Sequence, residues 1–201
     1  MRKSKKLKLR PIPKIILSVL MIAFVTLCSI FACNRHNNES SEPTYGLTRK
    51  QLDFIEQVGN AAQKNYGKYG ILPSMTTAQA ILESGWGESE LSALYYNFFG
   101  MRADSLYTGE SATLRTGEEI DGVLIKMDGD FRVYHSFEEG IEGYYQFITG
   151  YEHYSNLIWE KDYKTACYKI KEDGWATASN YSECLIDIIE SYDLTRFDYI
   201  E

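Results

Sequence analysis

The sequence lacks the residue clusters on which most metal- and cofactor-dependent enzymes rely. Its three histidines, His36, His135 and His153, are far apart, and no His/Cys group has metal-ligand spacing. No glycine-rich phosphate loop or internal repeat is apparent. The scattered histidines also give little support to a Ser/His or Cys/His nucleophile pair. We therefore expect neither a cofactor nor a metal site.

Cysteine is scarce as well. Only Cys167 and Cys184 follow residue 33, and each falls in a predicted helix. An oxidising compartment would permit a disulfide between them. Two buried free thiols are the alternative.

Basic residues are few beyond the start of the chain. There are 21 Lys and Arg against 28 Asp and Glu, and seven of the basic residues lie between Arg2 and Lys14. Without the first 33 residues the chain keeps 14 basic and 28 acidic residues, a net charge of −14. This charge makes nucleic acid an unexpected partner and gives no attraction to anionic membranes or wall polymers. Ligand binding must then depend on shape, hydrogen bonds and stacking.

An uncharged run from Ile15 to Cys33 follows the basic start and predicts a secretory signal or a membrane anchor. Its 19 residues approach the roughly 20 that span a bilayer, which favours an anchor. However, Ile30-Phe-Ala-Cys33 resembles the lipobox of bacterial lipoproteins, and cleavage there would leave Cys33 lipidated. Both interpretations place the rest of the chain outside the cytoplasm. Residues 34–46 are polar and are expected to form a flexible tether.

Hydrophobic periodicity predicts one mainly helical domain over residues 47–201. Helices are expected at 48–67, around Glu83, at 89–94, from Ser136 onward, at 162–172 and at 181–192. Between Ala112 and Tyr134, two Asp-Gly pairs and alternating apolar residues predict a three-stranded antiparallel meander. Helices around one small hairpin sheet make an α+β domain.

Glu83 stands in a segment that suits a general acid. Thr76 or Thr77 is expected to cap the start of its helix, and Gly85 is expected to end it. A carboxyl group in a last helical turn faces the negative end of the helix dipole, and Trp86 could shield it from water. Both effects raise the pKa, as acid catalysis at neutral pH requires. A solvent-facing glutamate on an ordinary helix is the alternative.

A second carboxylate is usual in enzymes that cleave glycosidic bonds. Glu118 and Glu119 lie on the predicted hairpin, and only one of them can face a groove because successive strand residues point to opposite faces. A solvated acidic hairpin tip is the alternative. Aromatic residues, 14% of the chain, can stack on sugar rings or belong to the core. Those near the presumed groove are Trp86, Tyr95, Tyr96, Phe98, Phe99, Tyr134, Trp175 and Tyr181.

Four segments, in chain order, carry a family resemblance. They are AQAILESGWGESELSALYYNFFGM from Ala78, TGEEIDG from Thr116, FRVYHSFE from Phe131 and GWATASNY from Gly174. Together they resemble the signature of bacterial glucosaminidases of the glycoside hydrolase family 73 type, which include the flagellar muralytic protein and autolysins. The resemblance spans roughly residues 47–195. It implies a lysozyme-like fold, with the hairpin flanking the active-site groove. It also implies hydrolysis of the β-1,4 bond between N-acetylglucosamine and N-acetylmuramic acid.

The resemblance also implies roles for single residues. Glu83 corresponds to the general acid and Glu118 to the second carboxylate, with the adjacent Glu119 as an alternative. Residues expected to bind substrate are Ser84, Trp86, Asn97, Phe98, Tyr134 and Tyr181. Ala178-Ser179 replaces the usual Asp-Pro, which puts the geometry of that loop in question. Retaining, inverting and substrate-assisted mechanisms all stay open.

The sequence thus predicts an exported, membrane-tethered, monomeric peptidoglycan endo-β-N-acetylglucosaminidase without a cofactor. Its expected partners are peptidoglycan glycan strands and, through the N-terminal lipid or helix, the bacterial membrane. A muramidase or lytic transglycosylase on the same scaffold is one alternative. A peptidoglycan-binding module without catalytic activity is another.

Overall fold

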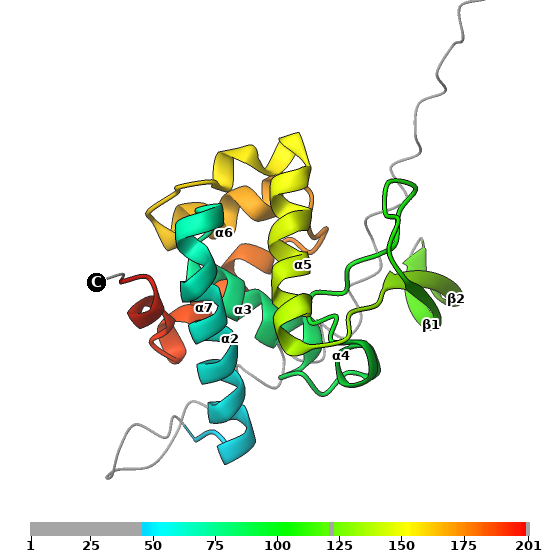
Figure 1. Cartoon of the computed structure of the whole chain (residues 1–201), viewed down its shortest axis with the longest axis horizontal. Coiled ribbons are helices and arrows are strands. Elements are labelled where there is room, and N and C mark those ends of the chain that lie inside the picture. Colours follow the sequence, from blue (N-terminus) through cyan, green and yellow to red (C-terminus); the bar gives the residue numbers. More distant parts are fainter. Residues whose placement is uncertain (1–45, 121–122, 200–201) are drawn as a thin grey trace, which may run out of the picture.

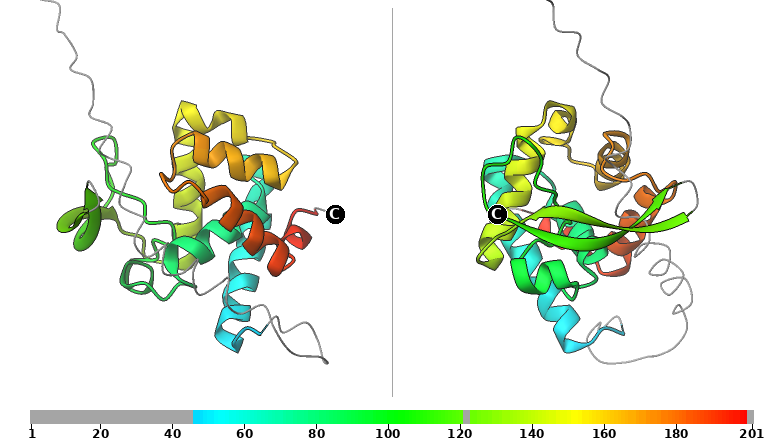
Figure 2. Two further views of the ribbon diagram at one scale, coloured as in Figure 1. Left: turned by 180° about the vertical axis from the view of Figure 1, so that it is seen from behind. Right: turned by 90° about the vertical axis from the view of Figure 1, so that its right-hand side faces the viewer.

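A helical body and a projecting β-hairpin make up the structure, a computed structural model that describes residues 46–120 and 123–199, without the side chains of 116–120 and 123–127. The hairpin and the C-terminal helical turn lie at opposite ends of the molecule (Figures 1 and 2). The predicted mainly helical α+β architecture is confirmed. The helices are α2 Arg49–Tyr69, α3 Pro73–Ser84, α4 Glu90–Tyr95, α5 Phe137–Gly150, α6 Tyr163–Glu172 and α7 Tyr181–Ser191, with 3-10 helices η2 Glu152–Leu157 and η3 Leu194–Phe197.

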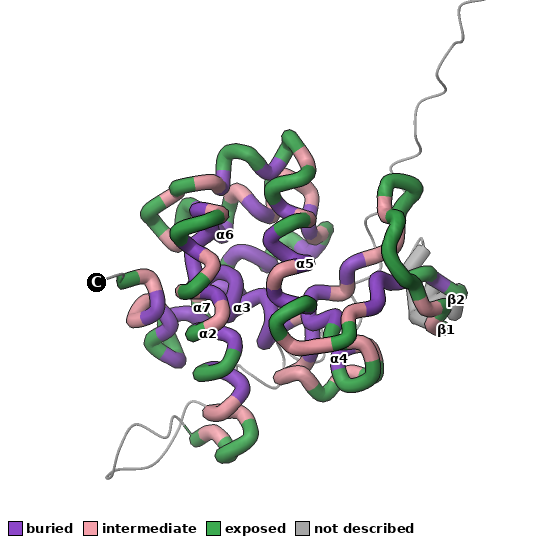
Figure 3. Tube along the Cα trace, viewed as in Figure 1, coloured by how far each residue is buried: buried purple, intermediate pink, exposed green. Residues whose placement is uncertain are grey.

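Helix α3 lies in the centre of the body. Every residue of α3 except Glu83 is buried, and α2, α6, α7 and η3 contact the helix. Figure 3 shows the buried segments gathered where these helices meet, with exposed segments at the periphery. Burial on all sides excludes water from the helix, so a polar side chain on it must find its hydrogen-bond partners inside the protein.

The prediction that Thr76 or Thr77 caps the start of α3 is wrong. The helix begins at Pro73, three residues before Thr76, and no side chain of its N-cap residue bonds to it. Proline suits a first helical position because the N–H that it lacks would have no helical partner there. Asp198, beyond η3, takes the place of a local cap and accepts the backbone N–H of Ser74 at 2.8 Å. Thr77 lies inside the helix and donates to the Pro73 carbonyl at 2.8 Å.

Two other helix starts follow the predicted capping pattern. Thr48 and Gln51 exchange side-chain and backbone hydrogen bonds at the start of α2, which makes a capping box. At the start of α5, the N–H of Glu139 donates to Ser136 Oγ at 3.1 Å. The Glu139 carboxylate accepts the N–H of His135, one residue before the N-cap, at 2.9 Å. The local signals therefore place both starts correctly.

The sheet has two antiparallel strands among the described residues, β1 Ser111–Ile120 and β2 Val123–Arg132. The predicted three-stranded meander is therefore wrong. Asp128-Gly129, expected as a second turn, lies inside β2. Gly129 serves a close contact instead, because a Cβ there would stand 2.5 Å from Nη1 of Arg102. The other expected turn, at 121–122, lies outside the described residues.

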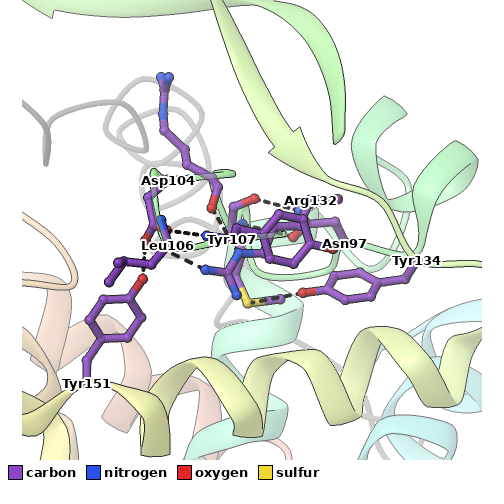
Figure 4. A network of polar contacts seen from close by, with 9 residues as sticks. Asn97, Asp104, Leu106, Tyr107, Arg132, Tyr134 and Tyr151 are labelled. Atoms are coloured by element: carbon purple, nitrogen blue, oxygen red, sulfur yellow. Dashed lines mark hydrogen bonds and ion pairs between the residues drawn. The ribbon is translucent and has the colours of Figure 1, made fainter. Parts of the chain in front are cut away.

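Asn97 attaches the base of the hairpin to the body (Figure 4). Its Nδ2 donates to the carbonyls of Met101 at 2.8 Å and Arg132 at 3.0 Å, and its Oδ1 accepts the Met101 N–H at 2.9 Å. The side chain is 1% exposed. These three bonds satisfy buried backbone groups on both sides of the junction.

Arg132, the last residue of β2, strengthens the same junction. Its Nε donates to the Arg102 carbonyl at 3.0 Å, and its Nη2 lies 3.7 Å from Oδ2 of Asp104. The guanidinium group stacks on the rings of Tyr107 and Phe147, 4.4 and 4.9 Å from their centroids. A planar guanidinium can make these contacts together, whereas an ammonium group cannot.

Two sequence predictions concern cysteine and the membrane. Cys167 and Cys184 form no disulfide, and burial raises the pKa of the Cys167 thiol to about 12.

None of the helices in the described part of the chain combines the length and the apolar character that crossing a bilayer requires. The predicted signal or anchor, the lipidation site Cys33 and nearly all of the tether precede residue 46, outside the described residues.

Candidate active site

Glu83 lies in the last turn of α3, as predicted. The helix ends because Gly85 adopts a left-handed conformation with φ 57°, and its N–H bonds back to the Ile81 carbonyl. Ser84 Oγ accepts the N–H of Gly87 at 2.6 Å, which folds the chain tightly after the helix. These contacts fix the backbone on both sides of Glu83.

Two donors hold one oxygen of the Glu83 carboxyl group. Tyr181 Oη donates to Oε1 at 2.6 Å and Trp175 Nε1 donates to the same atom at 3.1 Å. Burial raises the pKa of Glu83 to about 7, although the two hydrogen bonds lower it. Desolvation therefore outweighs the hydrogen bonds, and a large share of the molecules keeps this proton at neutral pH. That protonation state is the one a general acid needs.

A buried polar chain continues behind Tyr181. Its hydroxyl accepts a hydrogen bond from Gln79 Nε2 at 3.1 Å, and Gln79 Oε1 accepts the hydroxyl of Tyr144 at 2.5 Å. The three side chains are at most 1% exposed. Sequence reasoning missed Gln79 and Tyr144. A signal for Gln79 was present, because a residue four positions before Glu83 lies on the same face of a helix.

The six residues predicted to bind substrate occupy different environments. Tyr181 touches Glu83, whereas Asn97 holds the hairpin base. Ser84 is 1% exposed, and its hydroxyl bonds within the helix end. Four of the six predicted residues are buried, namely Ser84, Asn97, Phe98 and Tyr181. The other two, Trp86 and Tyr134, are partly exposed.

Trp86 is the residue predicted to shield Glu83 from water. The Trp86 ring packs edge to face on Tyr192, with centroids 5.3 Å apart. Trp175 and Tyr181 are the aromatic residues that bond to Glu83. The sequence pattern thus placed Trp175 and Tyr181 among the aromatic residues near the groove, but it did not predict their hydrogen bonds to Glu83.

Two neighbouring cavities lie along α2. One, of about 760 Å³, is formed by α2 and α5 and is lined by Tyr134; the other, of about 550 Å³, is formed by α2 and α4 and is lined by Trp86 and Phe98. Gln57 and Phe137 line both cavities. Glu83 lines neither of these two cavities.

The second carboxylate stays a prediction. Glu118 and Glu119 lie in β1, where their backbones pair with Ile125 and Leu124. The side chains of both glutamates are outside the described residues. Among the residues described, no group of three or more His, Cys, Asp or Glu side chains is arranged to hold a metal ion.

Comparison with known proteins identifies the family. Residues 59–194 match the Glucosaminidase profile, described as mannosyl-glycoprotein endo-beta-N-acetylglucosaminidase. Exo-glucosaminidase LytG of Bacillus subtilis is 33% identical over 98% of this chain and 70% of its own length. A probable N-acetylmuramidase of Lactococcus lactis is 35% identical over 80% of this chain, but this match spans only 38% of that relative.

Solved structures agree with the sequence match. The catalytic domain of the autolysin Auto from Listeria monocytogenes superposes with a TM-score of 0.66 and 31% identity, covering 87% of this chain and 96% of that domain. A glycoside hydrolase domain of FlgJ from Salmonella typhimurium gives a TM-score of 0.59 at 27% identity, covering 71% of this chain and 97% of that domain. The lysozyme-like α+β fold predicted from the sequence is thereby confirmed. This chain belongs to the glucosaminidase family.

Proposed function

We propose that this chain is a peptidoglycan hydrolase that cleaves the β-1,4 bond between N-acetylglucosamine and N-acetylmuramic acid. The observation that carries the proposal is Glu83, the one residue of α3 that stays partly exposed, whose partial burial raises its pKa to about 7. The names of the similar proteins, a glucosaminidase, an autolysin and a glycoside hydrolase domain, support the same chemistry.

Glu83 acts as the general acid in this proposal. Its Oε1 already accepts two hydrogen bonds, so Oε2 is the oxygen that delivers a proton to the leaving glycosidic oxygen. Once the proton has left, Tyr181 and Trp175 stabilise the carboxylate, which makes Glu83 a stronger acid than burial alone would allow. General acid catalysis of this kind contributes about 10²- to 10⁴-fold to the rate.

Glu118 is the proposed second carboxylate, with Glu119 as the alternative on the opposite face of β1. It stabilises the positive charge that develops on the sugar ring or activates water. The N-acetyl carbonyl oxygen of the substrate can perform the attack instead, and the carboxylate then orients and stabilises it. Comparison of Glu118→Gln with Glu119→Gln distinguishes the two glutamates, because only the residue that faces the substrate should lower kcat.

Trp86 and Tyr134 are the proposed glycan-contacting side chains, since both are partly exposed and line cavities. Tyr181 acts through Glu83 rather than by touching the sugar. Ser84, Asn97 and Phe98 are buried and shape the backbone around the site. The aromatic faces bind neutral sugar rings by stacking, which suits a strongly acidic chain that gains nothing from charge attraction.

A muramidase is the second candidate, because the similar Lactococcus lactis protein is named a probable N-acetylmuramidase. The two activities cleave alternate bonds of the same polymer and leave different reducing ends. Mass spectrometry of the products separates them. Anhydro-muramic ends would instead identify a lytic transglycosylase.

Export and tethering complete the proposal. The basic start and the apolar run up to Cys33 support export, and the lipobox-like Ile30-Phe-Ala-Cys33 supports attachment of lipid to Cys33. Residues 34–46 would then separate the catalytic domain, acting as a monomer, from the membrane. This location places Glu83 where peptidoglycan is accessible.

The test uses the full-length protein on purified sacculi. The parent should release reducing N-acetylglucosamine ends, and Glu83→Gln should lose about 10²- to 10⁴-fold in rate. Glu88→Gln is the matched control, because Glu88 is exposed and pairs with Lys50 on the surface. Equal rates for the parent and Glu83→Gln would show that the acid is another residue. Sacculus binding without turnover by the parent would favour the binding-module alternative.

A further inference from the structure

The hydrogen-bond chain behind Glu83 runs in one direction. Tyr144 Oη donates to Gln79 Oε1 at 2.5 Å, Gln79 Nε2 donates to Tyr181 Oη at 3.1 Å, and Tyr181 Oη donates to Glu83 Oε1 at 2.6 Å. The side chains come from three helices, α3, α5 and α7. Tyr144, Gln79 and Tyr181 are buried, so water does not compete for these groups.

The chemistry of each group fixes the direction. An ionised carboxylate only accepts, so Tyr181 must donate to Glu83 in that state. The Tyr181 oxygen is left to accept from the Gln79 nitrogen, which leaves the Gln79 oxygen for the Tyr144 hydroxyl. A tyrosine hydroxyl has one hydrogen. Since the Tyr181 oxygen accepts from Gln79, its hydrogen is left for Glu83.

Trp175 also requires Oε1 of Glu83 to act as a hydrogen-bond acceptor. Its indole N–H can only donate, and it donates to Glu83 Oε1 at 3.1 Å. Oε1 thus accepts two hydrogen bonds and is the carbonyl-like oxygen of the protonated carboxyl group. The proton then belongs on Oε2.

We infer that Gln79 and Tyr144 are positioning residues that direct the Tyr181 hydrogen to Oε1 of Glu83 and keep the catalytic proton on Oε2. The inference rests on the proposed role of Glu83 as general acid. If the Gln79 amide were turned over, its oxygen would capture the Tyr181 hydrogen. Glu83 would then donate its proton to Tyr181 and withhold it from the substrate. Tyr144 opposes this because its buried hydroxyl donates to the Gln79 oxygen, an acceptor that it would lose if the amide were turned over.

The other titratable groups around the chain stay neutral at neutral pH. Burial raises the pKa of Tyr144 and of Tyr181 well above the usual value for tyrosine. Tyr145, Tyr154 and Cys167, which act on Tyr144, also have pKa values raised by burial. Glu83 is therefore the member of this cluster whose charge changes near neutral pH.

The test compares the full-length proteins Tyr144→Phe and Tyr145→Phe with the parent. The two tyrosines are adjacent on α5 and fully buried, but the Tyr145 hydroxyl donates to Thr76 Oγ1 at 3.2 Å rather than to Gln79. Thr76 also interacts with Tyr144, yet loss of the Tyr145 hydroxyl leaves the bond from Tyr144 to Gln79 in place. Both changes keep the ring and remove one oxygen, so they are matched in size and burial.

The alkaline limb of the pH profile of kcat/KM reports the pKa of the acid in the free enzyme. Tyr144→Phe should move this limb upward by about 0.5 to 1 pH unit, because Glu83 loses part of a hydrogen bond that stabilises its charged form. Tyr145→Phe should leave the limb at the position of the parent. The inference would be overturned if the alkaline limb lay at the same pH in both variants, or if it moved to lower pH in Tyr144→Phe.

A second variant and a second readout keep the inference testable if Tyr144→Phe does not fold. Gln79→Met removes donor and acceptor together and should lower kcat by about tenfold with KM unchanged, as expected when an interaction acts only in the transition state. An unchanged kcat contradicts the inference. Because Trp175 bonds to Glu83, the pH dependence of tryptophan fluorescence, parent minus Glu83→Gln, also reports the ionisation of Glu83.

The fluorescence titration needs no substrate, so the two hypotheses can fail separately. An inactive parent whose Glu83 titration still shifts in Tyr144→Phe would refute the proposed function and keep the role of Tyr144. An active parent whose limb and titration are the same in both tyrosine variants would refute only the role of Tyr144.

Discussion

The helical body and the β-hairpin hold their acidic residues in contrasting ways. Glu83 stands on a helix that is otherwise buried along its whole length, and two hydrogen-bond donors hold its carboxyl group. Glu118 stands on a strand that, within residues 46–120 and 123–199, pairs with β2 alone in a two-stranded sheet. The body therefore supplies an acid whose position and pKa are set by packing, whereas the described contacts that hold the hairpin on the body lie at its base.

The difference shows where the hairpin depends on the body. An isolated two-stranded hairpin is at best marginally stable in water. In this chain Asn97 and Arg132 bind its base, and Phe131 to Val133 are buried where β2 enters the body. Among the described side chains, the polar and stacking contacts that join the hairpin to the body are therefore at its base, the end remote from Glu118.

Truncation of the body should have the largest effect. Ile81 is fully buried on α3, so Ile81→Ala should lower the free energy of unfolding by about 2 to 5 kcal/mol through lost apolar burial and a cavity. Leu114 on β1 is only partly buried, and Leu114→Ala should cost less than about 1 kcal/mol. Urea unfolding of both variants measures the contrast. An equal cost would mean that the hairpin belongs to the same packed core.

The partly buried Glu83 should make the stability of the body depend on pH. The pKa of Glu83 is about 7 in the folded state against an ordinary value of 4.5. The unfolded chain therefore loses this proton first as the pH rises from 4.5 to 7, so the free energy of unfolding falls across this window and stays low above it. The full effect is about 3 to 4 kcal/mol, since the two pKa values differ by about 2.5 and each pKa unit corresponds to about 1.4 kcal/mol.

Urea unfolding at pH 5 and pH 8, parent against Glu83→Gln, isolates this contribution from those of other carboxyl groups. Glu83→Gln should lack the decline and should be more stable than the parent at pH 8. If the difference between the two proteins is the same at both pH values, Glu83 ionises normally and the burial argument fails.

Local signals in the sequence predicted most of the fold. The capping residues Thr48 and Ser136, the apolar spacing of α7 and the glycine after Ser84 each act within one or two helical turns, and each placed an element correctly. The start of α3 failed because its cap, Asp198, comes from 124 residues further along the chain. No local pattern contains that contact.

The distinction between local and long-range contacts also explains which features of the site the sequence predicted and which it missed. Glu83 and its helix end could be read from adjacent residues. The raised pKa, however, comes from burial, and the groups that hold the carboxyl, Trp175 and Tyr181, come from the other end of the domain. Gly129 misled because glycine after aspartate indicates a turn, whereas here it makes room for Arg102.

A change at the hairpin base should affect stability less than either change in the body, Ile81→Ala or the ionisation of Glu83, but its effect on activity should nevertheless be clear. Arg132→Lys keeps the charge but loses the planar group that stacks on Tyr107 and Phe147, which should cost about 1 to 2 kcal/mol. Since this contact anchors β2, the strand paired with the one that carries the proposed second carboxylate Glu118, kcat should fall more than the loss of stability explains. Arg115→Lys, at an exposed position of β1, is the control and should change neither quantity. Parallel measurement of kcat and urea unfolding decides the matter, because a variant with lowered stability and unchanged kcat would show that the hairpin base does not position the catalytic residues.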